Sequence, residues 1–283
     1  MTASVPSNAA PLLNVQGLTK YYPGFTLDDV TFSIAPGRIT GFIGRNGAGK
    51  STTLKCLEGA VHPDAGAIEY FGRPFAGNEN LAKAQIGFEL GGADFYRTRR
   101  VATIADVTRR FYDNWDEDAF SHYCRLFALD GRKRLMDLSQ GMRVKLTVAL
   151  ALSHHARLLI LDEPTSGLDP ASREEVLDIL MDAAQREGAG VLFSTHITSD
   201  LDKCADDILY LRDGKLVGSG PVTTFKAHYA VATLAEARAA DAPALGIRRA
   251  TGGDSALVPA ESGLGRAATL EDIMTHTLKE DAA

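Results

Sequence analysis

Residues 44–52 read GRNGAGKST, and this stretch decides the fold. It fits the pattern G-x-x-x-x-G-K-[ST], follows the apolar run ITGFI at 39–43, and precedes STTLKCLEGA at 51–60, which has the pattern of a helix. Glycines let backbone N–H groups converge on phosphate oxygens without a Cβ in the way, and the helix N-terminus adds positive charge. A chance glycine-rich turn is the alternative, but the strand before the loop and the helix after it favour a phosphate-binding loop.

Two side chains of this loop have the chemistry to hold a nucleoside triphosphate. Lys50 would reach the β- and γ-phosphates as a point charge, and Ser51 would ligate Mg²⁺ through its hydroxyl. We therefore expect both residues at the centre of the site.

A second apolar run, LLILDEP at 158–164, ends in two carboxylates. A carboxylate at the C-terminal end of a sheet strand beside a phosphate loop is where such folds hold Mg²⁺, which assigns Asp162 to the metal. Glu163, one residue on, would polarise the attacking water as a general base. The alternative is a strand end with two solvated acids before a proline turn. Loop and strand together predict a nucleoside triphosphatase, without saying of which kind.

Composition sets outer limits on the function. The 283 residues carry a net charge of −6, which argues against nucleic acid or an anionic membrane surface as the main partner. The three cysteines match no zinc spacing and no disulfide framework, so a reducing cytosol is expected. No stretch approaches the roughly 20 apolar residues that cross a bilayer, and residues 1–11 read as a disordered tail rather than a secretory signal. Any work on a membrane would then need a partner chain.

The pattern along the chain predicts an α/β layer fold. Residues 12–72 read as short strands, and residues 100–155 are helical in period. The runs RLLILDEP and GVLFST, at 157–164 and 190–195, are almost continuously apolar, which is typical of buried parallel strands. Between them lies a helix with Asp169 as its N-cap, Pro170 in its first turn and Gly188 at its end. Strand, crossover helix and strand are typical of a parallel sheet.

Residues 221–283 differ in composition from the rest of the chain and are interpreted as a small accessory region. They are rich in alanine and glycine, and only their last segment is clearly periodic. Thr269 and Asp272 fit a capping box. The apolar face of the expected helix comprises Leu270, Ile273, Met274 and Leu278.

The stretch LSQGM at 138–142 opens another expected helix, QGMRVKLTVALALSHH at 140–155. Ser139 is well placed as its N-cap, and that local role alone would explain it. A capped helix N-terminus is also a surface that binds anions, so both roles can hold.

Several of these stretches, taken in order, resemble the motifs of ABC-transporter ATP-binding proteins. GRNGAGKST resembles Walker A, LLILDEP resembles Walker B, and LSQGM stands where that family carries its signature LSGGQ. SGLD at 166–169 is similar to the D-loop, His196 to the switch histidine, and Tyr22 to the aromatic residue that stacks on adenine. The resemblance covers about residues 12–220.

The resemblance implies a P-loop NTPase of the ABC ATPase type. This fold has a RecA-like core, an antiparallel β subdomain and an inserted α-helical subdomain, here at about 92–155. Two such subunits, identical or related, face each other head to tail, so each ATP lies between one subunit's Walker A and the other's signature. The implied partners are this second subunit and a transmembrane permease on whose cytoplasmic face the protein sits, with the helical subdomain docked on it. Nucleic acid is not among them.

The resemblance also implies roles for individual residues. Glu163 would be the catalytic base, His196 would sense the γ-phosphate, and Asp169 would work across the dimer seam, besides its capping role. Asp162 and Ser51 would hold Mg²⁺. ATP contacts would come from Tyr22, Gly44, Arg45, Asn46, Gly47, Ala48, Gly49, Lys50, Ser51 and Thr52 in one subunit, and from Ser139, Gln140 and Gly141 in the other.

Two departures from the family pattern matter. Gln140 and Met142 replace Gly and Gln of the signature, as in the branch of ABC-2-type exporters that includes bacitracin, multidrug and acetoin-utilisation ATPases. Gly91 stands where the Q-loop glutamine belongs, and Glu89 and Asp94 are the candidates to replace that residue.

The sequence therefore predicts the ATP-hydrolysing subunit of an ABC transporter, and its branch favours an exporter, with the cargo unspecified. One alternative is a non-transport ABC ATPase of DNA repair or ribosomes, but the chain lacks long coiled-coil arms and a second ATPase unit. Another is a regulatory subunit that binds ATP without turnover, which Gly91 would favour. The retained Glu163 and His196 argue against it.

Overall fold

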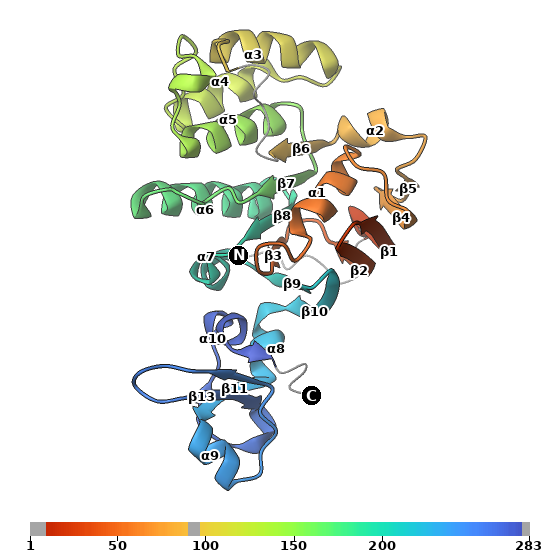
Figure 1. Cartoon of the computed structure of the whole chain (residues 1–283). Helices are drawn as coiled ribbons and strands as arrows, with labels where there is room; N and C mark the ends of the chain where they lie inside the picture. Colours follow the sequence, from red (N-terminus) through yellow and green to blue (C-terminus); the bar gives the residue numbers. More distant parts are fainter. Residues whose placement is uncertain (1–9, 90–96, 279–283) are drawn as a thin grey trace. The chain divides into compact units, whose positions relative to one another are not determined.

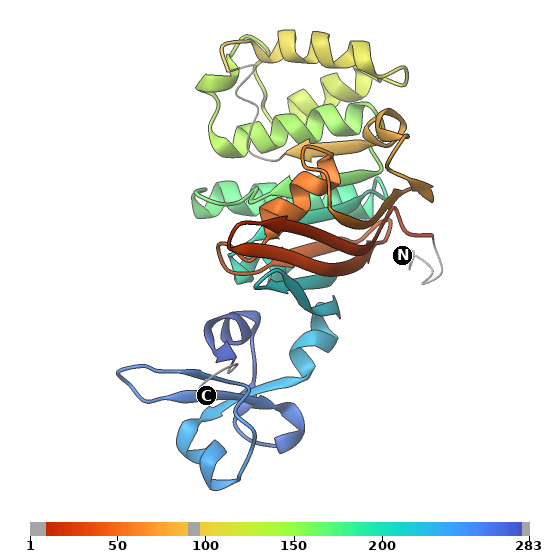
Figure 2. The same cartoon turned by 45° about the vertical axis from the view of Figure 1, so that its right-hand side comes forward.

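The computed structural model describes residues 10–89 and 97–278 (Figures 1 and 2). Gly91, Asp94 and most of the expected tail at 1–11 lie outside these residues. The chain divides into two compact units. One comprises Met1–His196 with Leu209–Val217, and the other comprises Ile197–Ile208 with Gly218–Ala283. The short segment before Leu209 thus groups with the C-terminal part, although the sequence offered only a boundary near residue 220.

The first unit is built on a six-stranded sheet. Its strand order is β10(Lys215–Pro221), β9(Asp207–Arg212), β3(Ile39–Ile43), β8(Gly190–Thr195), β7(Leu158–Asp162) and β6(Ile86–Glu89). The strands β3, β8, β7 and β6 run parallel, which confirms the strands expected at the three apolar runs and adds β6, which was not expected. All residues of β3 and β8 are buried, because helices and a second sheet cover both faces. Their carboxyl ends meet at one edge, where the phosphate loop, Glu163 and His196 follow.

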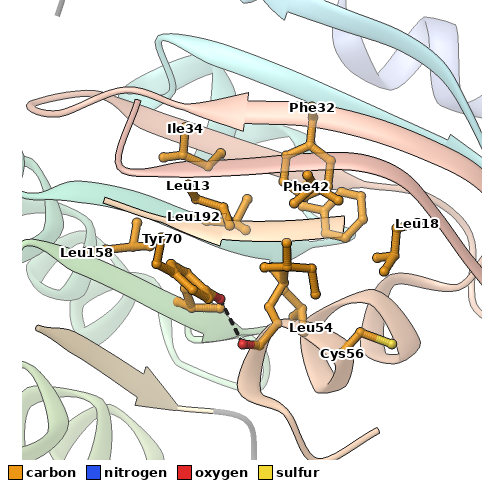
Figure 3. Close-up of a cluster of buried hydrophobic side chains, with 14 of the residues drawn as sticks. Leu13, Leu18, Phe32, Ile34, Phe42, Leu54, Cys56, Tyr70, Leu158 and Leu192 are labelled. Carbon is orange, nitrogen blue, oxygen red and sulfur yellow. Dashed lines mark hydrogen bonds between the residues drawn. The ribbon is translucent and has the colours of Figure 1, made fainter. Parts of the chain in front are cut away.

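A four-stranded antiparallel sheet supplies the β subdomain. Its order is β2(Phe25–Ile34), β1(Leu13–Tyr22), β4(Ala65–Tyr70) and β5(Arg73–Pro74). Helix α1(Lys50–Glu58) lies between the two sheets, and Leu54 packs there with Phe32, Phe42 and Leu192 (Figure 3). The hydroxyl of Tyr70 donates to the carbonyl oxygen of Leu57 at 2.8 Å, which ties this sheet to the C-terminal end of α1. The core thus fixes the helix that begins in the phosphate loop.

Short helices form the inserted region. They are α3(Val101–Thr108), η2(Arg109–Phe111), α4(Glu117–Leu126), η3(Leu135–Asp137) and α5(Gln140–Ser153), whereas α2(Glu79–Lys83) precedes β6 and lies outside this region. Figure 1 shows α3, α4 and α5 grouped beside the β6 edge of the sheet. The carboxylate of Asp116 caps α4 by accepting from the N–H of Ala119 at 2.9 Å, and two further acids follow in the first turn. The predicted helical segment is therefore confirmed.

The crossover helix α6(Pro170–Gln185) joins β7 to β8. Asp169 is its N-cap, as predicted, and its carboxylate accepts from the N–H groups of Ala171 and Ser172 at 3.1 Å. The helix ends three residues before Gly188, which adopts a left-handed φ of 72° in the turn to β8.

The second unit contains a five-stranded sheet of order β14(Arg266–Ala267), β11(Tyr229–Thr233), β13(Ser255–Pro259), β12(Gly246–Arg248) and β15(Thr277–Leu278). Its helices are α7(Thr198–Cys204), α8(Val222–Ala227), α9(Leu234–Ala239) and α10(Leu270–Thr275), with η4(Ala260–Ser262). The capping box of Thr269 and Asp272 is confirmed. The expected helical face through Leu278 is wrong. His276 leaves the helical conformation with Nδ1 2.5 Å from the Asp272 carbonyl oxygen, and Leu278 joins the sheet.

No helix within the ranges 10–89 and 97–278 is long and apolar enough to cross a membrane.

Candidate functional site

The phosphate loop connects β3 to α1 through glycines in conformations that other residues rarely adopt. Gly47 has a φ of 83°, and Gly49, the N-cap of α1, has a φ of 110°. A Cβ atom added at Gly49 would lie 2.9 Å from the ring of Phe25 and 3.0 Å from Leu27. Gly49 is therefore required twice, by its backbone conformation and by its close neighbours. No side chain caps α1, so its positive end faces the site.

Lys50 is buried inside this loop, with only 6% of its surface exposed. Its Nζ donates to the carbonyl oxygens of Gly44, at 2.7 Å, and Arg45, at 3.3 Å. Burial lowers the pKa of Lys50, while the nearby carboxylates of Glu163 and Asp162 oppose that shift. A buried cation that faces two carboxylates and a glycine-rich loop suits a polyphosphate, whose charge would stabilise the ammonium form further.

A hollow of about 530 Å³ opens above the loop. It brings together most of the loop residues expected to bind ATP and adds Glu163. Its lining comprises Gly24, Phe25, Asn46, Gly47, Gly49, Lys50, Ser51, Thr52 and Glu163. Gly44 and Ala48 are buried beneath the loop, and Arg45 is exposed at its outer side. The volume and the mixed polar lining suit a nucleotide.

The aromatic residue in this lining is Phe25, which the sequence motifs did not single out. Tyr22, the expected adenine contact, pairs with Phe25 across the β1–β2 hairpin and is 41% exposed. The Nζ of Lys20 lies 5.9 Å from the Tyr22 ring centroid. No local motif marks Phe25, whose place follows from its direct pairing with Tyr22, because residues opposite each other across a hairpin lie on the same face.

Asp162 ends β7 within reach of the loop. Its Oδ2 accepts a hydrogen bond from Ser51 Oγ at 3.1 Å, and its other carboxylate oxygen accepts from Ser194 Oγ on β8. Mg²⁺ prefers oxygen ligands and takes few of them from protein, so a hydroxyl and a carboxylate side by side fit this ion. The described residues contain no cluster of three or more His, Cys, Asp or Glu that could hold a metal by itself. The remaining ligands would be phosphate oxygens and water.

Glu163 is held in an unusual backbone conformation. Its φ is 52°, which costs a non-glycine residue on the order of 1 kcal/mol or more. Its N–H donates to the backbone carbonyl of Ser194 at 3.1 Å and to Ser194 Oγ at 3.0 Å. Ser194 thus orients both acids of the strand end. Motif reading missed it, because a serine in a buried strand has no pattern of its own.

His196 follows β8 and faces Glu163. Its Nδ1 lies 2.7 Å from Glu163 Oε2, and its side chain is 52% exposed. The structure therefore brings together the two residues expected to be catalytic, although they are 33 positions apart in the sequence.

The signature stretch begins α5 at a different place. Ser139 caps the helix, as predicted, because its Oγ accepts from the N–H of Met142 at 3.3 Å. Ser139 and Gln140 are exposed, whereas Gly141 is buried beside Leu168 of the SGLD segment. None of the three lines the loop hollow, although Gln140 lines a second hollow that also includes Asp162 and Glu163.

Glu89, one of the two candidates to replace the Q-loop glutamine, ends β6. Its Oε2 accepts a hydrogen bond from Thr147 Oγ1 of α5 at 2.7 Å. It lines a second hollow together with Gln140, Asp162 and Glu163. Glu89 therefore connects the edge that carries the acids to the helix that carries the signature. The other candidate, Asp94, and Gly91 itself lie outside the described residues.

Comparison with known proteins agrees with this geometry. The family described as ABC transporter matches residues 27–166. The bacitracin transport ATP-binding protein BcrA of Bacillus licheniformis is 31% identical over 218 residues, which cover 76% of this chain and 71% of BcrA. A solved structure described as the ATP-binding subunit of an ABC transporter is 28% identical, with a TM-score of 0.68 over 76% of this chain and 92% of that one.

Two further relatives are matched over a smaller share of their length. The Nod factor export ATP-binding protein I of Neorhizobium galegae is 34% identical, over 76% of this chain and 64% of its own length. The ribose import ATP-binding protein RbsA 1 of Rubrobacter xylanophilus is 33% identical, over 74% of this chain and 44% of its own length. Relatives named for export and for import thus share the same ATP-binding part.

Proposed function

The chain belongs to the family of ABC transporter ATP-binding proteins, which hydrolyse ATP, and on this basis we propose that it drives a separate transmembrane permease at the cytoplasmic face of a membrane. Export is the proposed direction. Its support is the similarity to the bacitracin and Nod factor proteins, together with Met142 at the end of the signature. A ribose import protein is also similar to this chain. The direction of transport is therefore the part of the proposal that depends most on the permease.

We propose that Glu163 is the general base. Its carboxylate borders the loop hollow, and the Nδ1 contact with His196 holds it there. In this arrangement Glu163 takes a proton from the attacking water, Lys50 holds the phosphates, and His196 contacts the γ-phosphate. Mg²⁺ held by Ser51 and Asp162 would neutralise phosphate charge during the reaction. Phe25 and Tyr22 are the proposed contacts of the adenine ring.

We further propose that the complete site needs two subunits. One observation carries this proposal: Lys50 and Glu163 line the loop hollow, whereas Ser139, Gln140 and Gly141 do not, and Ser139 is exposed. A second subunit in head-to-tail orientation would bring its own Ser139, Gln140 and Gly141 to the γ-phosphate, with Asp169 at the seam. ATP would then hold two chains together until it is hydrolysed.

Glu163→Gln tests the base. The amide cannot accept the proton, so we expect hydrolysis to fall by a factor on the order of 10²–10⁴ while ATP binding persists. With ATP and Mg²⁺ present, gel filtration of this variant should show a dimer. Glu271→Gln, at an exposed position of α10, is the matched control and should hydrolyse ATP normally. Unchanged ATP hydrolysis in Glu163→Gln would contradict the assignment of Glu163 as the base. If the variant with ATP bound is monomeric, the proposal of a site shared by two subunits is wrong.

A mixing experiment tests the shared site directly. Lys50→Ala and Ser139→Asp should each be inactive, because one loses the phosphate contact and the other places a carboxylate against phosphate while still capping α5. In a head-to-tail mixed dimer one of the two sites has both intact parts, so the mixture should regain roughly a quarter of the wild-type rate. A mixture of Lys50→Ala and Glu163→Gln should regain no ATP hydrolysis. Lys50 and Glu163 of one subunit serve the same ATP site, so each site of the mixed dimer carries one defect. No recovery in the first mixture would place the signature outside the site.

A further inference from the structure

Two basic segments of the helical region lie side by side, although more than thirty residues separate them in sequence. The N–H of Leu135 donates to the carbonyl oxygen of Arg99, and that of Met136 donates to Arg97, both at 2.9 Å. Arg100 and Arg134 pair as an antiparallel bridge, between the bond of Leu135 and a bond from the N–H of Val101 to the carbonyl oxygen of Lys133. We call residues 97–100 and 132–134 the basic ribbon. Its geometry depends on backbone atoms, so its side chains are not needed to hold it together.

The basic ribbon concentrates positive charge in an acidic protein. Its six cations are all exposed: Arg97, Arg99, Arg100, Arg132, Lys133 and Arg134. Two acids lie within these segments, Asp130, which pairs with Arg132 at 3.1 Å, and Asp137, which accepts from the backbone N–H of Arg134. Arg97 also lines the second hollow, whose acids are Glu89, Asp162 and Glu163. Residues 97–100 and 130–137 thus carry +4, while the whole chain carries −6. The overall charge, which argued against an anionic surface as partner, hides this local excess.

The form of the ribbon indicates the kind of partner. Six long side chains are spread along two exposed segments, which suits diffuse negative charge better than a single bound phosphate. A cluster of four to eight Lys or Arg is typical of surfaces that bind anionic lipids. Met136, two residues after the ribbon, is 46% exposed and offers an apolar side chain to the boundary between headgroups and acyl chains.

We propose that the basic ribbon binds the surface of a bilayer rich in anionic phospholipid. The contact would hold the helical region against the membrane in which a permease partner lies. It goes beyond the proposed ATPase and uses none of the residues assigned to the ATP site. Either proposal can therefore fail while the other stands.

Co-sedimentation of the full chain with vesicles tests the proposal. We expect binding to phosphatidylcholine vesicles that contain phosphatidylglycerol, little binding to pure phosphatidylcholine, and a decrease with added salt. Arg99→Glu with Lys133→Glu should weaken binding to the anionic vesicles at least about twentyfold, because each cation near such a surface contributes about fivefold. ATP hydrolysis without vesicles should stay at the wild-type rate.

A matched pair of reversals separates position from overall charge. Lys55→Glu with Arg249→Glu changes the net charge by the same amount at exposed positions outside the ribbon, and should leave vesicle binding nearly unchanged. Equal losses in both double variants would overturn the proposal, as would equal binding to neutral and anionic vesicles. Failure to bind anionic vesicles, with retention on immobilised polyglutamate that depends on the ribbon, would also overturn it and would identify an acidic polypeptide as the partner.

Discussion

The helices α1 and α5 begin in opposite ways, although both starts belong to motifs that contact phosphate in the family. At α1, Gly49 takes a left-handed conformation, no side chain caps the helix, and Lys50 is buried beneath the phosphate position. At α5, Ser139 caps the helix and lies exposed. The first start is shaped for a ligand by its own chain. The second is complete as a helix end, and the further role that we propose for it requires another molecule.

The largest effect is expected from a substitution at the start of α1. Gly49→Val forces a β-branched side chain into a φ of 110° and against Phe25 and Leu27. We expect a loss of about 2–4 kcal/mol in the free energy of unfolding, and no ATP binding. Denaturant titration and binding of a fluorescent ATP analogue would measure the two effects.

Gly47→Ala separates backbone strain from crowding in the same loop. Gly47 has a φ of 83°, but a Cβ there would meet nothing within 4 Å. We expect a loss of only about 1 kcal/mol. Equal losses in Gly47→Ala and Gly49→Val would mean that the packing against Phe25 and Leu27 contributes little.

A second test concerns the C-terminal end of α5. Because the N-terminal end of this helix is exposed, we expect its stability to depend on its buried residues. His154 is 2% exposed and stacks on Tyr112 with ring centroids 3.8 Å apart. Burial lowers the pKa of His154 from 6.5 to about 4. The unfolded chain therefore binds a proton first as the pH falls, which favours unfolding.

The expected result is a loss of stability between pH 6.5 and 4 of up to about 3 kcal/mol, with full stability above pH 6.5. His154→Phe keeps an aromatic ring and removes the titration, so its stability should depend less on pH in this window. His155→Gln, at the exposed neighbouring position, should behave as wild type. Identical pH profiles for wild type and His154→Phe would exclude His154 as the source.

The two helix starts also show how far sequence reasoning reaches. The phosphate loop, the acids of β7 and the caps of α5, α6 and α10 were predictable, because each depends on neighbours within a few residues. Phe25 and Ser194 were not, since their roles depend on a hairpin and on a parallel strand pair that bring distant residues together. The sheet of the second unit was missed for a related reason. Its strands are short and pair with distant segments, so local periodicity does not reveal them.

Charge is the clearest example of a property whose local distribution cannot be read from the net value for the sequence. A net charge of −6 is correct for the chain, but the pairing of residues 97–100 with 132–134 creates a cationic surface that no sum can show. The fold had to be known before the two segments could be considered together.

The smallest expected effect is the most specific to the comparison. Ser139→Ala removes the cap of α5 and should cost about 1 kcal/mol of stability, whereas Ser139→Asn provides another good N-cap and should cost little. If Ser139 acted only as a cap, ATP hydrolysis would follow stability, and Asn would restore both. If its hydroxyl also contacts ATP held by a second subunit, Asn restores stability while hydrolysis stays low, because the larger amide occupies the place of the phosphate. Thermal denaturation and ATPase rates of the two variants, measured at one protein concentration, therefore separate a helix that merely begins at Ser139 from one whose first residue serves the neighbouring chain.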